Sequence, residues 1–263
     1  MASDYYSLHD KAVIEGFLRR KTDLHLYELG DLDDFFWPRT IWFADAKAPP
    51  LSAICLLYLG QSQPTLLALG DVPPLITLLK NISDLLPGWF YAHVSPGVEA
   101  AFEGAFQLEP HGDHLKMSLN YPTKLLDTSP PRSERLGPEH LPEILQLYRE
   151  SYPENWFDPR MLETREYFGV REEGRLISIA GVHVYSPVLK VAALGNITTA
   201  SSHRKLGLAT AATRELCLSL MRKVDYVGLN VAAGNHAAID CYRKLGFEVS
   251  AIYREFSIHR IRY

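Results

Sequence analysis

The second half of the chain shows two different hydrophobic periods. Apolar residues three and four positions apart predict helices over residues 141–150, 206–224 and 237–244. Alternating or continuous apolar runs predict strands over residues 167–171, 176–185, 191–199, 226–232 and 249–258, with a turn at 172–174. A short additional helix is expected after Asp158, which can cap it, with Pro159 in its first position. Gly246 is expected to end the last helix in a left-handed conformation.

The first half of the chain shows a similar order of elements. Its patterns predict helices over residues 9–20, 23–29, 73–86 and 98–106, and strands over residues 40–44, 51–59, 65–69, 89–94 and 114–120. Residues 125–138 lie between the halves and contain a Pro-Pro pair, small polar residues and charges without a periodic apolar face. We therefore expect an α/β (α+β) protein of two similar domains, 1–130 and 131–263, each with a mixed central sheet flanked by helices.

Composition and charge narrow the classes of function. A chain of 263 residues with 47% hydrophobic and 22% charged residues is long enough for two domains with cores of their own. The net charge of −4 gives no electrostatic reason to expect a nucleic-acid partner. The apolar runs are too short to span a bilayer, and no secretory signal pattern opens the chain. Cys55, Cys217 and Cys241 have neither metal-site nor disulfide spacing, which is typical of reduced thiols. We expect a cytoplasmic protein with no membrane partner; the sequence does not specify an oligomeric state.

The segment with the clearest chemistry joins the strand at 191–199 to the helix at 206–224. Such a junction directs several unpaired backbone N–H groups outward, with the positive end of the helix dipole behind them. This arrangement is suited to bind a pyrophosphate. Gly207 lets the backbone approach an anion closely, small Ala209 lets the helix pack against a ligand, and Arg204 and Lys205 add positive charge at the rim.

The pattern Arg204-x-x-Gly207-x-Ala209 resembles the pyrophosphate loop of the GNAT acetyltransferases. Asn235-x-x-Ala238-x-x-x-Tyr242-x-x-x-Gly246-Phe247 is similar to the second signature of that superfamily, and the two blocks stand in the same order, separated by one helix and one strand. The resemblance covers residues 135–263 and is nearest to the glycine N-acyltransferase-like branch. It implies a tandem of two GNAT-like domains with a degenerate N-terminal copy. The sequence departs from the usual pattern at Ser201, where many relatives have proline, and at His203, where an aromatic residue is common, but neither change removes a backbone donor.

The resemblance implies that acetyl-CoA is the acyl donor. It assigns backbone groups of the strand to the pantetheine arm and to the oxyanion, the loop and first helical turn to the pyrophosphate, and one asparagine side chain to the cofactor beyond it. The residues so implied are Ile197, Thr198, Thr199, Arg204, Lys205, Leu206, Gly207, Leu208, Ala209, Thr210 and Asn235. Two alternatives stay open here: Gly207 as an ordinary turn glycine, and Asn235 as a helix N-cap.

Tyr242 is the residue that the resemblance implies for catalysis. A phenol of pKa about 10 is protonated at neutral pH and can donate its proton to a departing thiolate; the alternative is a tyrosine that only packs on the sheet. Cys241 should face elsewhere, because adjacent helical residues point about 100° apart, and we expect it in the core. Chemistry also needs a base that deprotonates the amine. The strand at 191–199 contains no carboxylate, and the candidates elsewhere are Glu154, His183 and Asp240.

The predicted function is an N-acetyltransferase acting on a primary amine of a small molecule or peptide; the alternative is a CoA-binding regulatory or scaffold protein. Residues 152–158 are expected either to hold a cationic amine through Glu154 or Asp158 or to form a hydrophobic lid. The corresponding junction of the first half, residues 69–74, contains Asp71 and two prolines, so we expect no CoA site there. No metal is expected, because His111 and His114 lack a third ligand nearby. The acidic and aromatic residues 31–36 are interpreted as a capped loop.

Overall fold

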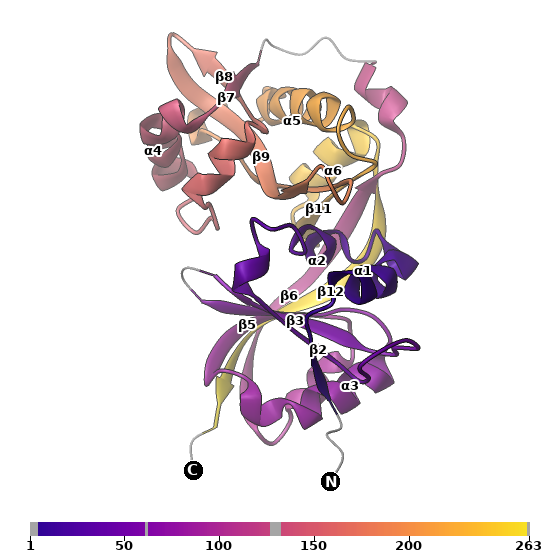
Figure 1. The fold of residues 1–263 in the computed structure, drawn as a ribbon. Coiled ribbons are helices and arrows are strands. Elements are labelled where there is room, and N and C mark those ends of the chain that lie inside the picture. Colours follow the sequence, from indigo (N-terminus) through magenta and orange to yellow (C-terminus); the bar gives the residue numbers. More distant parts are fainter. Residues whose placement is uncertain (1–4, 61–62, 127–132, 262–263) are drawn as a thin grey trace. The chain divides into compact units, whose positions relative to one another are not determined.

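The chain folds into two compact units, which Figure 1 shows as a ribbon. The computed structural model describes residues 5–60, 63–126 and 133–261. Unit 1 takes its residues from 1–116, 232–234 and 250–263, and unit 2 from 117–231 and 235–249. The predicted domain boundary near residue 130 lies outside the described residues. Along the described chain, no helix has both the length and the apolar character that crossing a membrane requires.

Unit 1 contains a mixed sheet in the order β1-β2-β3-β4-β5-β12-β6. The strands are β1 (Tyr6–Leu8), β2 (Thr40–Ala44), β3 (Ile54–Leu59), β4 (Pro64–Ala68), β5 (Trp89–Val94), β6 (Phe106–Leu119) and β12 (Phe247–Arg260). β4 pairs with β5 in parallel, whereas the pairs from β1 to β4 and the pair β5–β12 are antiparallel. Helices α1 (Lys11–Leu18) and α2 (Leu26–Gly30) cover one face of this sheet, and α3 (Val72–Asn81) covers the other (Figure 1).

In unit 2 the strands follow the order β11-β10-β9-β8-β7. The strands are β7 (Glu134–Leu136), β8 (Tyr167–Glu172), β9 (Arg175–Ser186), β10 (Val191–Thr199) and β11 (Tyr226–Ala232); the helices are α4 (Leu141–Ser151), α5 (Leu208–Leu220) and α6 (His236–Lys244). β10 and β11 are parallel, and the other pairs are antiparallel. Both units therefore follow one plan of a short strand, one or two helices, three antiparallel strands, a helix and a parallel strand. The predicted α/β fold with a mixed sheet flanked by helices is confirmed.

Short 3-10 helices connect many of these elements. They are η1 (Arg19–Lys21), η2 (Trp37–Arg39), η3 (Ser83–Leu85), η4 (Val98–Phe102), η5 (Pro122–Leu126), η6 (Pro138–His140), η7 (Pro159–Thr164) and η8 (Ser201–His203). The helix predicted at 98–106 is only η4, and the strand predicted at 114–120 begins already at Phe106. The residues that follow Phe106 are largely exposed and polar, so they carry no alternating apolar pattern. β1 and β7 were not predicted, because three residues are too few to show a period.

Two local features of unit 2 agree with their sequence signals. Glu173 and Gly174 have φ angles of 48° and 81° in the tight turn between β8 and β9. Gly246 follows α6 with a φ of 98°, as expected for a left-handed helix end. A Cβ atom at Gly246 would also lie 2.1 Å from the carbonyl oxygen of Tyr121, so only glycine fits here without a backbone shift.

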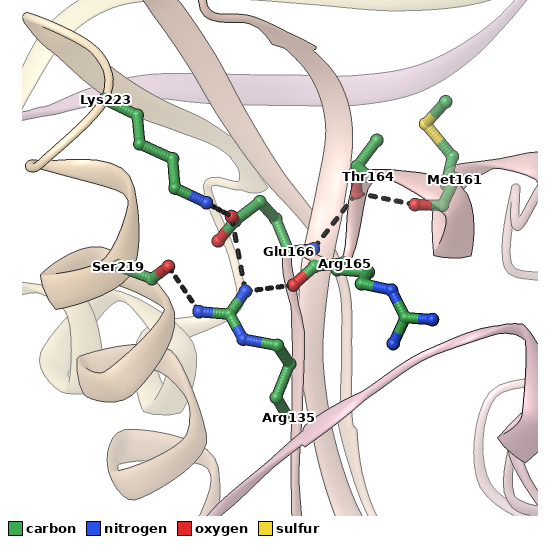
Figure 2. A network of polar contacts seen from close by, with 7 residues as sticks. All are labelled: Arg135, Met161, Thr164, Arg165, Glu166, Ser219 and Lys223. Atoms are coloured by element: carbon green, nitrogen blue, oxygen red, sulfur yellow. Dashed lines mark hydrogen bonds and ion pairs between the residues drawn. The ribbon is translucent and has the colours of Figure 1, made fainter.

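A buried ion network holds the C-terminal end of α5 against the sheet of unit 2 (Figure 2). The fully buried Glu166 carboxylate forms ion pairs with Lys223, just beyond α5, and with Arg135 on β7, at 3.3 Å. The Arg135 guanidinium also donates to Ser219 Oγ on α5 at 2.8 Å and stacks over the ring of Phe168. The network therefore fixes the axis of α5, whose opposite end begins at Leu208.

Candidate functional site

The turn between β10 and α5 has the backbone conformation that a close approach to an anion needs. Lys205 and Gly207 both adopt positive φ angles, 65° and 76°. A Cβ atom at Gly207 would meet nothing within 4 Å, so the constraint on this position comes from its φ angle rather than from lack of space. α5 begins at Leu208 without a side-chain cap and without an acidic residue in its first turn. The positive end of the helix dipole is thus left uncompensated by the chain itself.

The backbone amides of this turn point to no protein acceptor. The first hydrogen bond of α5 runs from the amide of Ala211 to the carbonyl of Gly207, at 3.0 Å. Among the described residues, the N–H groups from Lys205 to Thr210 have no hydrogen-bond partner. The side chains of Arg204 and Lys205 are exposed and likewise engage none of the described residues. Residues 204–210, called the amide-rich turn below, therefore offer six adjacent N–H donors and two cationic side chains to a ligand.

β10 separates from its parallel neighbour before it reaches this turn. β10 pairs with β9 from Val191 to Thr199, whereas its register with β11 runs only from Val191–Tyr226 to Leu194–Leu229. A one-residue bulge lies between Gly195 and Thr198, where Asn196 has a φ of 55°. Ile197 thus lies within the bulge, and Thr198 and Thr199 follow it and lead through η8 to the turn before α5.

Two of the three implied pantetheine residues, Thr198 and Thr199, make polar contacts within the fold. Ser178 on β9 donates to the carbonyl of Thr198 at 3.2 Å and hydrogen-bonds the hydroxyl of Thr199 at 2.8 Å. The Thr198 hydroxyl lies 3.5 Å from the carbonyl of Ser151 in α4. The two threonine hydroxyls are therefore engaged within the fold, as is the Thr198 carbonyl, whereas these contacts leave the main chain of Ile197 and Thr199 to a ligand.

Tyr242 lies on the inner face of α6. Its residue is 8% exposed, and its ring packs edge-on against Phe247 at 5.9 Å. Its hydroxyl has no hydrogen-bond partner among the described residues. Burial, and then the neighbouring Cys241 and Tyr152, raise the pKa of Tyr242 above its ordinary value, so the phenol stays protonated at neutral pH. A buried, protonated phenol without a partner can serve as a proton donor.

A contact between two helices places α6, the helix of Tyr242, against the first turn of α5. The Thr210 hydroxyl, in the first turn of α5, lies 3.1 Å from Sγ of Cys241 on α6. Cys241 itself is partly buried, and burial raises the pKa of its thiol, which makes it a poor nucleophile. The segment proposed for acceptor selection approaches the same place, because Tyr152 is among the groups that affect the pKa of Tyr242.

Asn235 is the N-cap of α6. Its side-chain oxygen accepts a hydrogen bond from the amide of Ala238 at 3.2 Å. The capping interpretation therefore holds, and the amide nitrogen of the same exposed side chain is still available to a ligand. Capping fixes the start of the helix that carries Tyr242.

The candidate bases occupy different surroundings. Glu154 is exposed, and Asp240 is an exposed residue of α6 that lies 3.9 Å from the Arg243 guanidinium. Asp158 is committed locally: it caps η7 through the amide of Arg160 and forms an ion pair with the Arg160 side chain at 2.5 Å. His183 is partly buried on β9, against β10.

Two glycines across β9 and β10 are the feature that sequence reasoning missed. Gly181 and Gly195 are register partners, and the rings of Tyr167 and His183 occupy the space of their absent side chains. Isolated glycines inside predicted strands are a signal for a bulge or a close approach, and could have drawn attention to this place.

The other sequence candidates lie in unit 1. His111 Nε2 is 2.8 Å from the Ser257 hydroxyl and His114 Nε2 is 3.4 Å from Glu255, so the two rings have separate partners. Among the described residues, no group of three or more His, Cys, Asp or Glu side chains could hold a metal ion. At the junction that corresponds to the α5 start, Asp71 precedes α3, whose first turn contains two prolines.

Comparisons with known proteins agree with this geometry. A model of the acetyltransferase (GNAT) family matches residues 141–247, which contain β10, the amide-rich turn and Tyr242. These residues form a GNAT acetyltransferase domain. The comparisons do not support the nearer resemblance to the glycine N-acyltransferase-like branch. A search of curated proteins found no significant match.

Several solved structures share the fold over nearly the whole chain. A Drosophila protein solved by a structural genomics consortium has a TM-score of 0.72 at 12% identity and covers 98% of this chain and 99% of its own. An acetyltransferase of the GNAT family from Colwellia psychrerythraea has a TM-score of 0.60 at 16% identity, covering 98% and 99%. A tandem GNAT protein from the clavulanic acid biosynthesis pathway has a TM-score of 0.60 at 16% identity, covering 97% and 98%. At sequence identities this low, the structural similarity shows that these proteins share a GNAT-like fold with this chain.

Proposed function

We propose that the protein transfers the acetyl group of acetyl-CoA to a primary amine of a small molecule or peptide by direct attack. The observation that carries this proposal is the row of unpartnered amides from Lys205 to Thr210. Backbone groups that are left unpaired are expected to find a partner, and a helix N-terminus favours a negatively charged one. Two linked phosphates match both the number and the sign of these donors.

The side chains around the turn support a nucleotide-like ligand. Arg204 and Lys205 extend from the rim without ion pairs among the described residues, so they can neutralise phosphate charge. The main chain from Ile197, in the β10 bulge, to Thr199, at the end of the strand, leads toward the turn and extends the site along β10. An arm that leaves the pyrophosphate along β10 brings its thioester toward the bulge.

Tyr242 is the acid of the proposed reaction. The amine nitrogen forms a bond to the carbonyl carbon and then releases a proton to solvent, the C–S bond breaks, and the sulfur takes the phenolic proton of Tyr242. The phenolate regains a proton from solvent, which restores the enzyme. A main-chain N–H of Ile197 to Thr199 stabilises the oxyanion, a contribution of about 3 kcal/mol for one preorganised donor.

Substitution of Gly207 by glutamate tests the binding part of this proposal. At roughly 4 Å, two unit charges near a protein surface repel by about 4 kcal/mol, and each ~1.4 kcal/mol changes affinity tenfold. Gly207→Glu should therefore weaken acetyl-CoA binding, measured by calorimetry, on the order of a hundredfold or more.

Gly104→Glu is the matched control. Gly104 has a φ of 80° and equally open surroundings, but it lies in unit 1. This variant carries the same backbone strain and the same added charge and should bind acetyl-CoA as the unmodified protein does. An unchanged acetyl-CoA affinity in Gly207→Glu would show that the turn does not bind the pyrophosphate.

A second candidate function is a CoA-binding regulatory or scaffold protein without turnover, and the absence of any carboxylate on β10 favours it. Release of free thiol from acetyl-CoA, followed across a panel of primary amines, separates the two. Thiol release that depends on an amine supports the transferase. Tight acetyl-CoA binding without release for any amine supports the scaffold.

A further inference from the structure

Two glycines, Gly181 on β9 and Gly195 on β10, lie next to each other in the paired strands. Gly181 and Gly195 stand opposite each other in the register, so their missing side chains would point to the same face. A Cβ at Gly181 would lie 2.0 Å from the Tyr167 ring, and one at Gly195 would lie 1.9 Å from Cδ2 of His183. The two rings therefore lie on one face of the sheet, each against bare backbone.

A bulge in β9 directs the His183 ring to this position. The register passes from Ala193–Val184 to Leu194–Val182, which leaves His183 as the additional residue of β9. Bulges re-aim a side chain and are frequent beside active sites. Here the consequence is that an imidazole from β9 occupies the space of a side chain that β10 lacks at Gly195.

Helix α4 and residues 152–158, the acceptor segment expected to hold the amine, pack on this same face of the sheet. Tyr148 on α4 donates to the carbonyl of Asn196 at 2.8 Å, and the Asn196 amide donates to the Tyr167 hydroxyl at 3.2 Å. The ring of Phe157 packs against Tyr148 at 5.0 Å and against Tyr167 at 5.9 Å. His183 thus lies on the side where residues 152–158 pack, over the residue that directly precedes the bulge of β10.

We propose that His183 accepts the proton of the attacking amine. This inference rests on the proposed function. A protonated amine has no lone pair for attack, and β10 contains no ionisable side chain that could remove the proton. A neutral imidazole nitrogen takes that proton and becomes imidazolium, the amine lone pair then forms the C–N bond, and the imidazolium returns the proton to solvent.

The two other candidates are less suited to this role. Asp240 is an exposed residue of α6 close to Arg243, and Glu154 is exposed in the acceptor segment. Among the described residues, neither carboxylate forms a hydrogen bond or ion pair with β10, whereas the place of the His183 ring is set by Gly195 and by the bulge.

The test compares two acceptors in two variants. His183→Gln keeps a polar side chain, and His183→Phe keeps a ring over Gly195, so at least one should fold. With an alkyl amine, which is almost fully protonated at neutral pH, we expect kcat to fall about a hundredfold in both, the usual scale of base catalysis. With a weakly basic aryl amine, already neutral at the same pH, the loss should be only a few-fold. The affinity for acetyl-CoA should not change.

A pH profile and a control complete the experiment. In the unmodified protein, the rate with the alkyl amine should fall in one step on the acid side of the pH profile, because a protonated base cannot accept the amine proton. In His183→Gln this step should disappear. His259→Gln, an exposed histidine of unit 1, serves as the control and should change nothing.

Two results would overturn the assignment. Equal losses with both amines mean that His183 acts only through packing, and full activity of both variants means that the base lies elsewhere. Either result leaves the proposed function intact. Absence of amine-dependent thiol release from the unmodified protein would overturn the proposed function and this inference together.

Discussion

The buried network around Glu166 allows a prediction of which of two variants is the less stable, because its members differ in burial. Glu166 has no exposed side-chain surface, whereas the side chains of Arg135 and Lys223 are 40% and 39% exposed. In Glu166→Gln the two cations can turn to solvent, and no buried charge is left behind. In the double variant Arg135→Met/Lys223→Met, the carboxylate stays buried without either partner.

These two situations carry different costs. Losing hydrogen bonds to a charged group lowers the free energy of unfolding by about 1.5–3 kcal/mol. Leaving an uncompensated buried charge lowers it by about 3–5 kcal/mol. The double variant should therefore be less stable than Glu166→Gln, although it removes two partly exposed residues and spares the buried one.

Hydrogen exchange at the α5 amides, followed through a urea series, measures this locally in unit 2. Glu163→Gln is the control: Glu163 is exposed on η7 with no partner among the described residues, and its substitution should change stability by less than about 0.5 kcal/mol. A Glu166→Gln variant that is as stable as the unmodified protein, or less stable than the double variant, would refute the reasoning.

The remaining predictions concern Tyr242 and Asp31. Tyr242→Phe should lower kcat about a hundredfold or more while acetyl-CoA affinity stays constant, because only the proton donor is lost; a fully active variant would reduce Tyr242 to packing. Burial, and then the neighbouring Glu28, raise the pKa of Asp31 well above its ordinary value. The stability that protonated Asp31 contributes is present below its unfolded-state pKa, about 3.9, and is lost as pH rises through the folded-state pKa. Asp31→Asn should flatten this decline in pH-dependent urea unfolding and stabilise the protein at neutral pH; an unchanged slope would contradict the assignment.

The parts of the site that depend on neighbouring residues could be predicted from the sequence. Arg204, Gly207 and Ala209 lie within six positions of one another, and the helix start they predict is close to the observed one at Leu208. Gly246 and the capping by Asn235 follow the same logic, because a helix end is decided by its own residues.

The parts that depend on register could not be predicted. The His183 ring lies over Gly195 only because both strands are bulged, and a one-residue slip would direct it to the other face. The Glu166 network joins residues 31 and 57 positions apart, at separations where no local pattern operates. The bulges and the buried ion pairs could therefore be identified only from the structure.

The central claim is that the amides from Lys205 to Thr210 receive the pyrophosphate of CoA. A crystal structure of the protein with CoA tests it most directly. The account predicts phosphate oxygens within hydrogen-bonding distance of these N–H groups, with the pantetheine arm along Ile197 to Thr199. Nucleotide bound at another place, or the same N–H groups donating to protein acceptors in the complex, would contradict it.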